Sequence, residues 1–393
     1  MTLPERTGPL KGVRVLELVG IGPGPFAAML FADLGADVIR IDRPGGNALQ
    51  ATPPEFDVLS RGRPSAAVDL KNERGIGVVL DLAEQADILI EGFRPGVAER
   101  LGLGPQACHA RNPRLVYGRI TGWGQDGPLA HSAGHDLNYI GVAGALGAIG
   151  RAGGPPQIPL NLLGDFGGGS LYLVAGVLAA LIHARATGEG QVVDAAITDG
   201  VAHLLAMTIG MQGAGAWAAE RGTNLLDSGA PFYDVYETAD GRYMSVAGLE
   251  PLFYSTMVQL LELENLPDRT DSKQWPALRA ILARTFAART QAEWTSLFDG
   301  TDACVSPVLP LDGVAQHPHN AARGTYTVHE GLLQPAPAPR FSRTPARLTT
   351  PPVRPGANTV EALGAWGVAD LDALLADGVV VQAEPPRLKE NMP

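Results

Sequence analysis

Val13-Arg14-Val15-Leu16-Glu17-Leu18 is followed by the glycine- and proline-rich turn at residues 20–25, by the apolar segment FAAMLFADLG (residues 26–35) and by Ala36-Asp37-Val38-Ile39-Arg40-Ile41-Asp42. The first and last stretches are mostly apolar and rich in β-branched residues, which is typical of buried strands. The segment between them has helical spacing. The opening of the chain therefore predicts a strand, a helix and a second strand.

The same alternation continues, with strands expected at residues 66–70, 86–90, 115–120 and 191–196. This order predicts an α/β fold with a mainly parallel, Rossmann-like sheet. Asp42 stands about where an acidic residue would meet the ribose of a dinucleotide. However, Pro23 and Pro25 remove two backbone donors and the G-x-G-x-x-G spacing is missing, which argues against a nicotinamide cofactor.

A different pattern begins near residue 230. Residues 231–237 and 243–246 flank the turn Ala239-Asp240-Gly241 and predict a β-hairpin, which signals a second, smaller α+β domain. We expect a large domain at residues 1–200, a connecting helix at 201–225 and a small domain at 226–325. Residues 326–393 would form a proline-rich strap and a last helix that packs back on the large domain.

Composition limits the classes of partner. The net charge of -11 argues against a general polyanion binder, so nucleic acid is not expected, although a few local arginines and lysines can still hold a small phosphorylated ligand. Cys108 and Cys304 lie far apart in the sequence, which fits a reducing compartment. Because the start of the chain lacks a signal-peptide pattern, we expect a cytoplasmic protein.

Two stretches without charge, residues 166–182 and 200–219, are long enough to raise the question of a membrane span. Both are rich in glycine, and the second contains His203 and Gln212. They are therefore expected to be buried helices, and no membrane span is predicted.

Three sharp turns carry ionisable groups, at His135, at Asp165 and at Glu250. Taken singly, each has an ordinary interpretation as a loop residue or a helix cap. The segment around Asp165 is the most informative, because Gly167-Gly168-Gly169 follows the aspartate at the start of an apolar helix. Unobstructed backbone N–H groups there would hold a carbonyl oxygen that gains negative charge.

The chain resembles the family III CoA-transferase superfamily and, within it, the branch of racemases that act on 2-methylacyl-CoA. The resemblance runs from about residue 9 to residue 309 and extends toward residue 345. It is carried by GPLKGVRVLELVGIGPGPFAAMLFADLGADVIRIDRPG, DLKNERG, IEGFRPGVAERLGLG, TGWGQDGP, GHDLNY, NLLGDFGGGS, GQVVDAAITDG, GAPFYDVYETADGRY, DACVSPVL and APRFSRTP.

This resemblance implies an interlocked homodimer with each site between the large domain of one subunit and the small domain of the other. It further implies that His135 and Asp165 are the acid/base pair on opposite sides of the substrate carbon, with Glu250 orienting and charge-balancing His135. Contacts to coenzyme A are implied for Ile21, Arg43, Val68, Leu70, Lys71, Arg94, Arg100, Asp136 and Tyr139. Arginine and lysine suit the phosphates of coenzyme A.

Under this interpretation coenzyme A arrives as part of the acyl-CoA substrate, and no separate cofactor and no metal are expected. The reaction would interconvert (2R)- and (2S)-2-methylacyl-CoA, because His135 and Asp165 can supply the two groups of opposite protonation that inversion needs. In the transferases of the superfamily the matching aspartate is a nucleophile that forms an acyl anhydride, and a histidine at position 135 is not the rule. Two alternatives stay open: a CoA-transferase and a non-catalytic acyl-CoA binding protein.

Overall fold

The computed structural model describes residues 6–18, 20–46 and 52–384. The chain forms two compact units. We call Met1–Val142, Asn161–Leu204 and His319–Pro393 the large unit, and Ala143–Leu160 with Leu205–Pro318 the small unit. The sequence had placed residues 143–160 in the large domain. The predicted large domain begins with residues 1–5, and the predicted strap and last helix run on to residues 385–393. Both of these short ranges lie outside the described part of the chain.

A seven-stranded sheet forms the centre of the large unit within the described residues, in the order β12-β3-β2-β1-β4-β5-β6. All neighbouring strands are parallel except β12, which runs antiparallel to β3. The order 3-2-1-4-5-6 is that of doubly wound Rossmann folds, so the predicted α/β class is confirmed. The strands are β1 (Arg14–Leu18), β2 (Asp37–Asp42), β3 (Ser65–Val68), β4 (Ile88–Glu91), β5 (Val116–Thr121), β6 (Val192–Ala196) and β12 (Val380–Val381).

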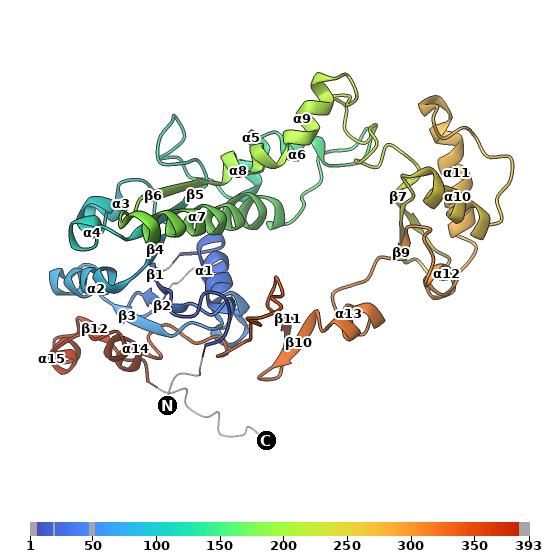
Figure 1. Ribbon diagram of the computed structural model, residues 1–393. Helices are drawn as coiled ribbons and strands as arrows, with labels where there is room; N and C mark the ends of the chain where they lie inside the picture. Colours follow the sequence, from blue (N-terminus) through green and yellow to red (C-terminus); the bar gives the residue numbers. More distant parts are fainter. Residues whose placement is uncertain (1–5, 19, 47–51, 385–393) are drawn as a thin grey trace. The chain divides into compact units, whose positions relative to one another are not determined.

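Helices cover both faces of this sheet (Figure 1). Successive strand residues point to opposite faces, so in β1 Val15 packs toward one helical layer and Leu16 toward the other. One layer holds α1 (Pro23–Asp33) and α7 (Leu171–Thr187). The opposite layer holds α2 (Glu73–Gln85), α4 (Pro105–Arg111), α14 (Thr359–Ala365) and α15 (Leu371–Ala376).

One segment of the described chain, Leu162–Thr187, is long and apolar enough to cross a membrane by length and composition. Its α7 part buries Leu173, Val177 and Leu181 in the cluster that also contains strand residues of the central sheet. Packing on the sheet therefore accounts for the apolar character of this segment.

The glycine- and proline-rich turn at residues 20–25 leads into α1 and supplies its first residues. Gly22 has a φ of 73°, in the left-handed region that favours glycine, and Pro23 takes the first helical position, where its missing N–H costs nothing. Proline here begins a helix at the carboxyl end of β1.

The segment around Asp165 differs from the expected start of an ordinary helix. Residues Leu162–Ser170 form a π-helical stretch that continues into α7. In such a stretch the N–H groups of Gly167 to Gly169 bond to carbonyls five residues earlier, so they are not free to hold a substrate oxygen. The glycines allow close packing instead: a Cβ built at Gly168 lies 2.6 Å from Val201 Cγ2 on α8 (Ile197–Leu204).

The expected long helix after Asp199 is divided. The helix α8 ends at Leu204, and α9 (Ala206–Gly213) begins after it. The division between the two units falls at this break.

The small unit is built on an antiparallel sheet, and the predicted hairpin is present as β7 (Tyr233–Glu237) and β8 (Tyr243–Ala247), joined by β9 (Val305–Pro307). Its core cluster takes side chains from α10 (Pro251–Leu260), α11 (Trp275–Phe286) and α12 (Gln291–Phe298).

Polar contacts hold residues 143–160, which contain α6 (Ala145–Ala148), in the small unit. Arg151 Nη1 lies 2.5 Å from Asp234 Oδ1, and Arg221 Nη2 donates to the Gly154 carbonyl oxygen at 2.5 Å. These contacts join parts of the chain that are far apart in sequence, which explains why no local pattern revealed them.

The end of the described chain returns to the large unit. After α13 (Pro318–Arg323) and the hairpin of β10 (Tyr326–His329) and β11 (Leu332–Pro335), the proline-rich strap runs without regular structure to α14. Arg61 Nη1 donates to the Pro335 carbonyl oxygen at 2.8 Å, and the Gly62 N–H donates to the Thr350 carbonyl oxygen at 2.9 Å. The strap is thus fixed on the large unit at both ends.

Candidate active site

The site residues of the large unit gather at the carboxyl edge of the sheet, where the strand order reverses between β1 and β4. Ligands of doubly wound folds bind at this point. The turn after β1 carries Gly22, and the π-helical segment brings Asp165 against it: a Cβ built at Gly22 would lie 3.2 Å from Asp165 Oδ2. A larger residue at position 22 would displace the carboxylate.

Contacts to the start of α1 hold the Asp165 backbone. The rings of Phe26 and Phe166 stack with centroids 4.4 Å apart. Ser170 Oγ lies 2.7 Å from the Pro23 carbonyl oxygen and 2.9 Å from that of Asp165. The π-helical segment that carries the Asp165 carboxylate is therefore held against α1.

The electrostatic surroundings of Asp165 favour its protonated form. Burial raises the pKa of this carboxyl, and the negative charge of Asp136 raises it further. A hydrogen bond from Asn161 Nδ2 to Asp165 Oδ2 at 3.2 Å and the charge of His135 act in the opposite direction and lower the pKa. A carboxyl with a raised pKa that still exchanges its proton is suited to acid/base chemistry.

His135 stands directly before α5 (Asp136–Val142) and its side chain is exposed. Its backbone N–H donates to Asn138 Oδ1 at 3.0 Å, and its carbonyl oxygen accepts from the Tyr139 N–H at 3.2 Å. The neighbouring Asp136 Oδ1 accepts the backbone N–H of Asp165 at 2.7 Å. This bond joins the segments that carry His135 and Asp165.

A cavity of about 120 Å³ opens between the loops that follow β4 and β5, and its lining includes Gly134, which directly precedes His135. Tyr139 lies on its wall, with its ring edge-on to Trp123 at 4.8 Å and its hydroxyl donating to the Gly134 carbonyl oxygen. The pKa of Tyr139 is raised by burial and by the charge of Asp165, and Arg94 opposes this shift. Arg94 also lines the cavity, so a guanidinium group and a phenol face the same space.

A buried ion-pair cluster shapes the loop that carries Arg94. Glu91 is fully buried at the end of β4, and it accepts the Phe93 N–H at 2.6 Å and Arg119 Nε at 2.8 Å. Arg119 also pairs with Glu99 at 2.8 Å. No sequence pattern predicts this cluster, because a single Glu at a strand end has no period of its own.

The residues implied for coenzyme A divide into two groups. Arg43, Lys71, Arg94 and Arg100 are exposed on the large unit, and their side chains make no ion pair with the described residues. Ile21 of the same group is also exposed, with 60% of its surface accessible, and Leu70 and Tyr139 are half-buried.

The second group faces inward. Val68 is completely buried and pairs with Val380 of β12, so its side chain cannot reach a ligand. Asp136 is 8% exposed, and its carboxylate accepts the backbone N–H of Asp165. The structure thus gives Asp136 an internal role that the sequence did not predict.

Glu250 belongs to the small unit, where it is exposed directly before α10. Within that unit burial lowers the pKa of Arg269, and the negative charge of Glu250 opposes this shift. Arg269 Nη1 donates to the Gly248 carbonyl oxygen at 3.1 Å. Across residues 6–18, 20–46 and 52–384, no three His, Cys, Asp or Glu side chains are grouped to hold a metal ion.

Comparison with known proteins identifies the family. The model of CoA-transferase family III matches residues 10–359. The chain belongs to this family. It is 44% identical over 391 residues to the alpha-methylacyl-CoA racemase of Mus musculus, covering 98% of this chain and 100% of the relative.

The alpha-methylacyl-CoA racemase of Homo sapiens is 46% identical over 342 residues, covering 86% of this chain and 87% of its own length. Among solved structures, a CAIB/BAIF family protein from Brucella suis matches with a TM-score of 0.80 at 26% identity, covering 92% of this chain and all of that one. The family-III member described here therefore shares its fold with solved members of the family.

Proposed function

We propose that this family-III protein is a racemase that interconverts (2R)- and (2S)-2-methylacyl-CoA thioesters. The observation that carries the proposal is the hydrogen bond from the Asp165 N–H to Asp136 Oδ1 at 2.7 Å, which brings the segments of Asp165 and His135 together. Burial raises the pKa of the Asp165 carboxyl, which suits it to proton transfer. The similarity to two mammalian proteins named alpha-methylacyl-CoA racemase over most of the chain supports it.

In this mechanism the substrate carbon next to the thioester carbonyl lies between His135 and Asp165. The unprotonated member of the pair takes the proton from one face and leaves an enolate, and the protonated member returns a proton to the other face. Both groups end in the opposite protonation state, and exchange with water resets them. Raising the pKa of Asp165 narrows its difference from an imidazole, which makes transfer in both directions comparably easy.

The CoA part of the substrate is expected to bind along the carboxyl edge of the sheet. Arg43, Lys71, Arg94 and Arg100 are exposed cations there, and guanidinium and ammonium groups suit phosphate oxygens. Coenzyme A enters with the substrate, so the proposal needs no separate cofactor.

We further propose that the enzyme works as a homodimer in which Glu250 of the small unit orients His135 of the partner subunit's large unit. A carboxylate at one imidazole nitrogen fixes the tautomer and leaves the other nitrogen to accept the substrate proton. This arrangement follows from the resemblance to the family and from the separate units that carry the two residues.

Deuterium exchange separates the candidate functions. One epimer of a 2-methylacyl-CoA is incubated in deuterated water without an acceptor acid, and a racemase gives a mixed epimer pool with label at C2. Retained hydrogen together with transfer of CoA to an added free acid would establish a CoA-transferase that uses Asp165 as nucleophile. Tight binding with neither reaction would indicate an acyl-CoA binding protein.

Variants test the residue roles. We expect Asp165→Asn and His135→Gln each to stop interconversion, while each retains isotope exchange on one epimer, because the remaining base still reaches one face. His183→Ala, which removes another exposed imidazole of the large unit, is the control and should keep the wild-type rate. Wild-type interconversion in both site variants would remove this assignment.

A further inference from the structure

A second cavity of the large unit lies far from the chemistry described above. It measures about 300 Å³ and is formed by the segment before β1 and by the proline-rich strap. Among the described residues that line it, four are cationic and none is acidic, although the whole chain carries a net charge of -11. The lining residues are Arg6, Thr7, Gly8, Lys11, Arg343, Thr344, Pro345 and Arg347.

This basic cavity lies at the amino edge of the sheet. A Cβ built at Gly8 would stand 3.0 Å from the Gly35 nitrogen, in the turn that leads into β2. The acid/base residues and the exposed cations of the proposed CoA site follow the opposite, carboxyl ends of the strands. A ligand of the basic cavity would therefore be distinct from the acyl-CoA substrate.

The walls of the basic cavity are fixed by contacts within the large unit. Arg6 Nη1 donates to the carbonyl oxygens of Ala36 at 2.8 Å and Gly62 at 3.1 Å. The strap is held on both sides of Arg343 and Arg347, by the bonds at Pro335 and Thr350 described above. The cationic groups are thus presented by backbone that is already anchored.

Two of the four cationic side chains in this cavity, Arg343 and Arg347, lack partners among the described residues. Arg6 is partly neutralised by Asp37, whose Oδ1 lies 3.5 Å from Arg6 Nε. Arg343 and Arg347 are exposed, and their side chains make no hydrogen bond or ion pair with the part of the chain that the structure describes. Thr7 Oγ1 is buried and has no hydrogen-bond partner there. Such a concentration of like charge is relieved by a bound anion.

We propose that this cavity binds a small phosphorylated ligand, with Arg343 and Arg347 engaging the phosphate oxygens. Planar guanidinium groups bind phosphate through paired hydrogen bonds. The volume stands at the lower end of small-molecule sites, which fits a phosphate ester of modest size. Both arginines belong to or adjoin the APRFSRTP segment, for which the proposed racemase activity has no use.

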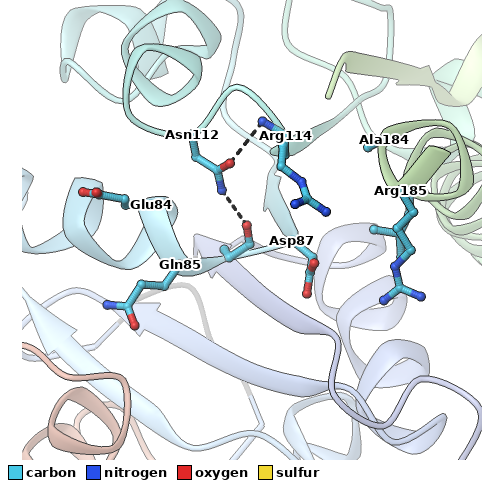
Figure 2. Close-up of a pocket in the computed structure, with 9 residues that line it drawn as sticks. Glu84, Gln85, Asp87, Asn112, Arg114, Ala184 and Arg185 are labelled. Carbon is cyan, nitrogen blue, oxygen red and sulfur yellow. Dashed lines mark hydrogen bonds between the residues drawn. The ribbon is translucent and has the colours of Figure 1, made fainter. Parts of the chain in front are cut away.

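Another cavity of the large unit provides a contrast and a control. Figure 2 shows it, about 250 Å³ in volume, with Arg114 and Arg185 on its wall. Here Asp87 and Glu84 line the same space, so positive and negative charges are balanced. The charge-balanced cavity of Figure 2 therefore offers a bound anion no comparable stabilisation.

Titration calorimetry with inorganic phosphate tests the proposal. The full-length protein is held in saturating coenzyme A, so that the proposed active site is filled, and ionic strength is kept constant with chloride. We expect saturable binding to the wild type, and a dissociation constant at least tenfold higher for Arg343→Gln/Arg347→Gln. The matched pair Arg114→Gln/Arg185→Gln, which removes the same charge, should stay within twofold of the wild type.

Two results would overturn the proposal: no saturable phosphate binding to the wild type, or unchanged binding in the Arg343→Gln/Arg347→Gln variant. The substitution of both arginines by lysine provides a second measurement that keeps the charge. It should weaken binding less than glutamine does, because ammonium groups attract phosphate without the paired geometry. None of these outcomes depends on whether the protein racemises acyl-CoA.

Discussion

Replacing Gly75 with alanine would add a methyl group where α2 meets the turn after β3. A Cβ built there lies 3.0 Å from the Asp69 carbonyl carbon and meets its oxygen at a still shorter distance. Contacting carbon atoms are normally about 3.5–4.0 Å apart, so helix and turn must separate by about 0.5–1 Å. This turn leads directly into Leu70 and Lys71, which we propose as contacts to coenzyme A.

The same helix offers a matched control. A Cβ at Gly77 meets nothing within 4 Å. Both substitutions gain the higher helix propensity of alanine, about 1 kcal/mol, so the difference between the two variants isolates the steric cost. Overpacking of this kind costs about 1–3 kcal/mol. For a domain of this size that corresponds to a melting temperature roughly 2–12 °C lower for Gly75→Ala than for Gly77→Ala.

Thermal unfolding and calorimetric titration with coenzyme A measure the two consequences. We expect Gly77→Ala to match or exceed the wild-type melting temperature with unchanged affinity, and Gly75→Ala to lose both stability and affinity. Equal melting temperatures would refute the steric argument. A less stable Gly75→Ala protein that binds coenzyme A normally would instead remove the turn after β3 from the binding site.

Three further outcomes are expected. Asp136→Asn keeps an acceptor for the Asp165 N–H but removes the charge that raises the pKa of Asp165, so the limb of the pH–rate profile that reports this group should move to lower pH. Arg63→Met leaves the buried Glu17 without the guanidinium 2.6 Å away. It should lower the free energy of unfolding, measured in urea, by about 3–5 kcal/mol. Adding Glu17→Gln to the same chain should restore much of this loss. Burial raises the pKa of the Cys108 thiol to about 11, so it should react with a disulfide reagent at pH 8 only after unfolding.

Much of the large unit could be predicted from the sequence because buried parallel strands need nearly continuous apolar runs. The segment at residues 13–18 has such a run and forms β1 (Arg14–Leu18), and residues 115–120 form β5 (Val116–Thr121). The attachment of residues 143–160 to the small unit could not be predicted in this way. It depends on single charges such as Arg151 and Asp234, which lie far apart in sequence and have no period.

The candidate site, too, could be predicted from the sequence only in part. Resemblance to a family assigned roles to His135 and Asp165, but it also placed Asp136 among the contacts to coenzyme A. The structure turns Asp136 toward the Asp165 backbone, and the supporting contact of Asn161 had no sequence signal at all. Neighbours that shape a pKa are set by tertiary packing, which a local pattern does not contain.

The glycines around Asp165 link the fold to the chemistry. Each glycine in a helix costs up to about 1 kcal/mol relative to alanine, and nothing in the local sequence offsets several of them in one segment. Their benefit is distance: a Cβ at Gly164 would lie 2.8 Å from Asp136 Cγ, and one at Gly168 would lie 2.8 Å from the Val201 nitrogen. Side chains at these positions would push the segment away from α5 and α8. Burial and, after it, the nearby carboxylate of Asp136 raise the pKa of Asp165, so the close packing that glycine permits at positions 164 and 168 contributes to this shift.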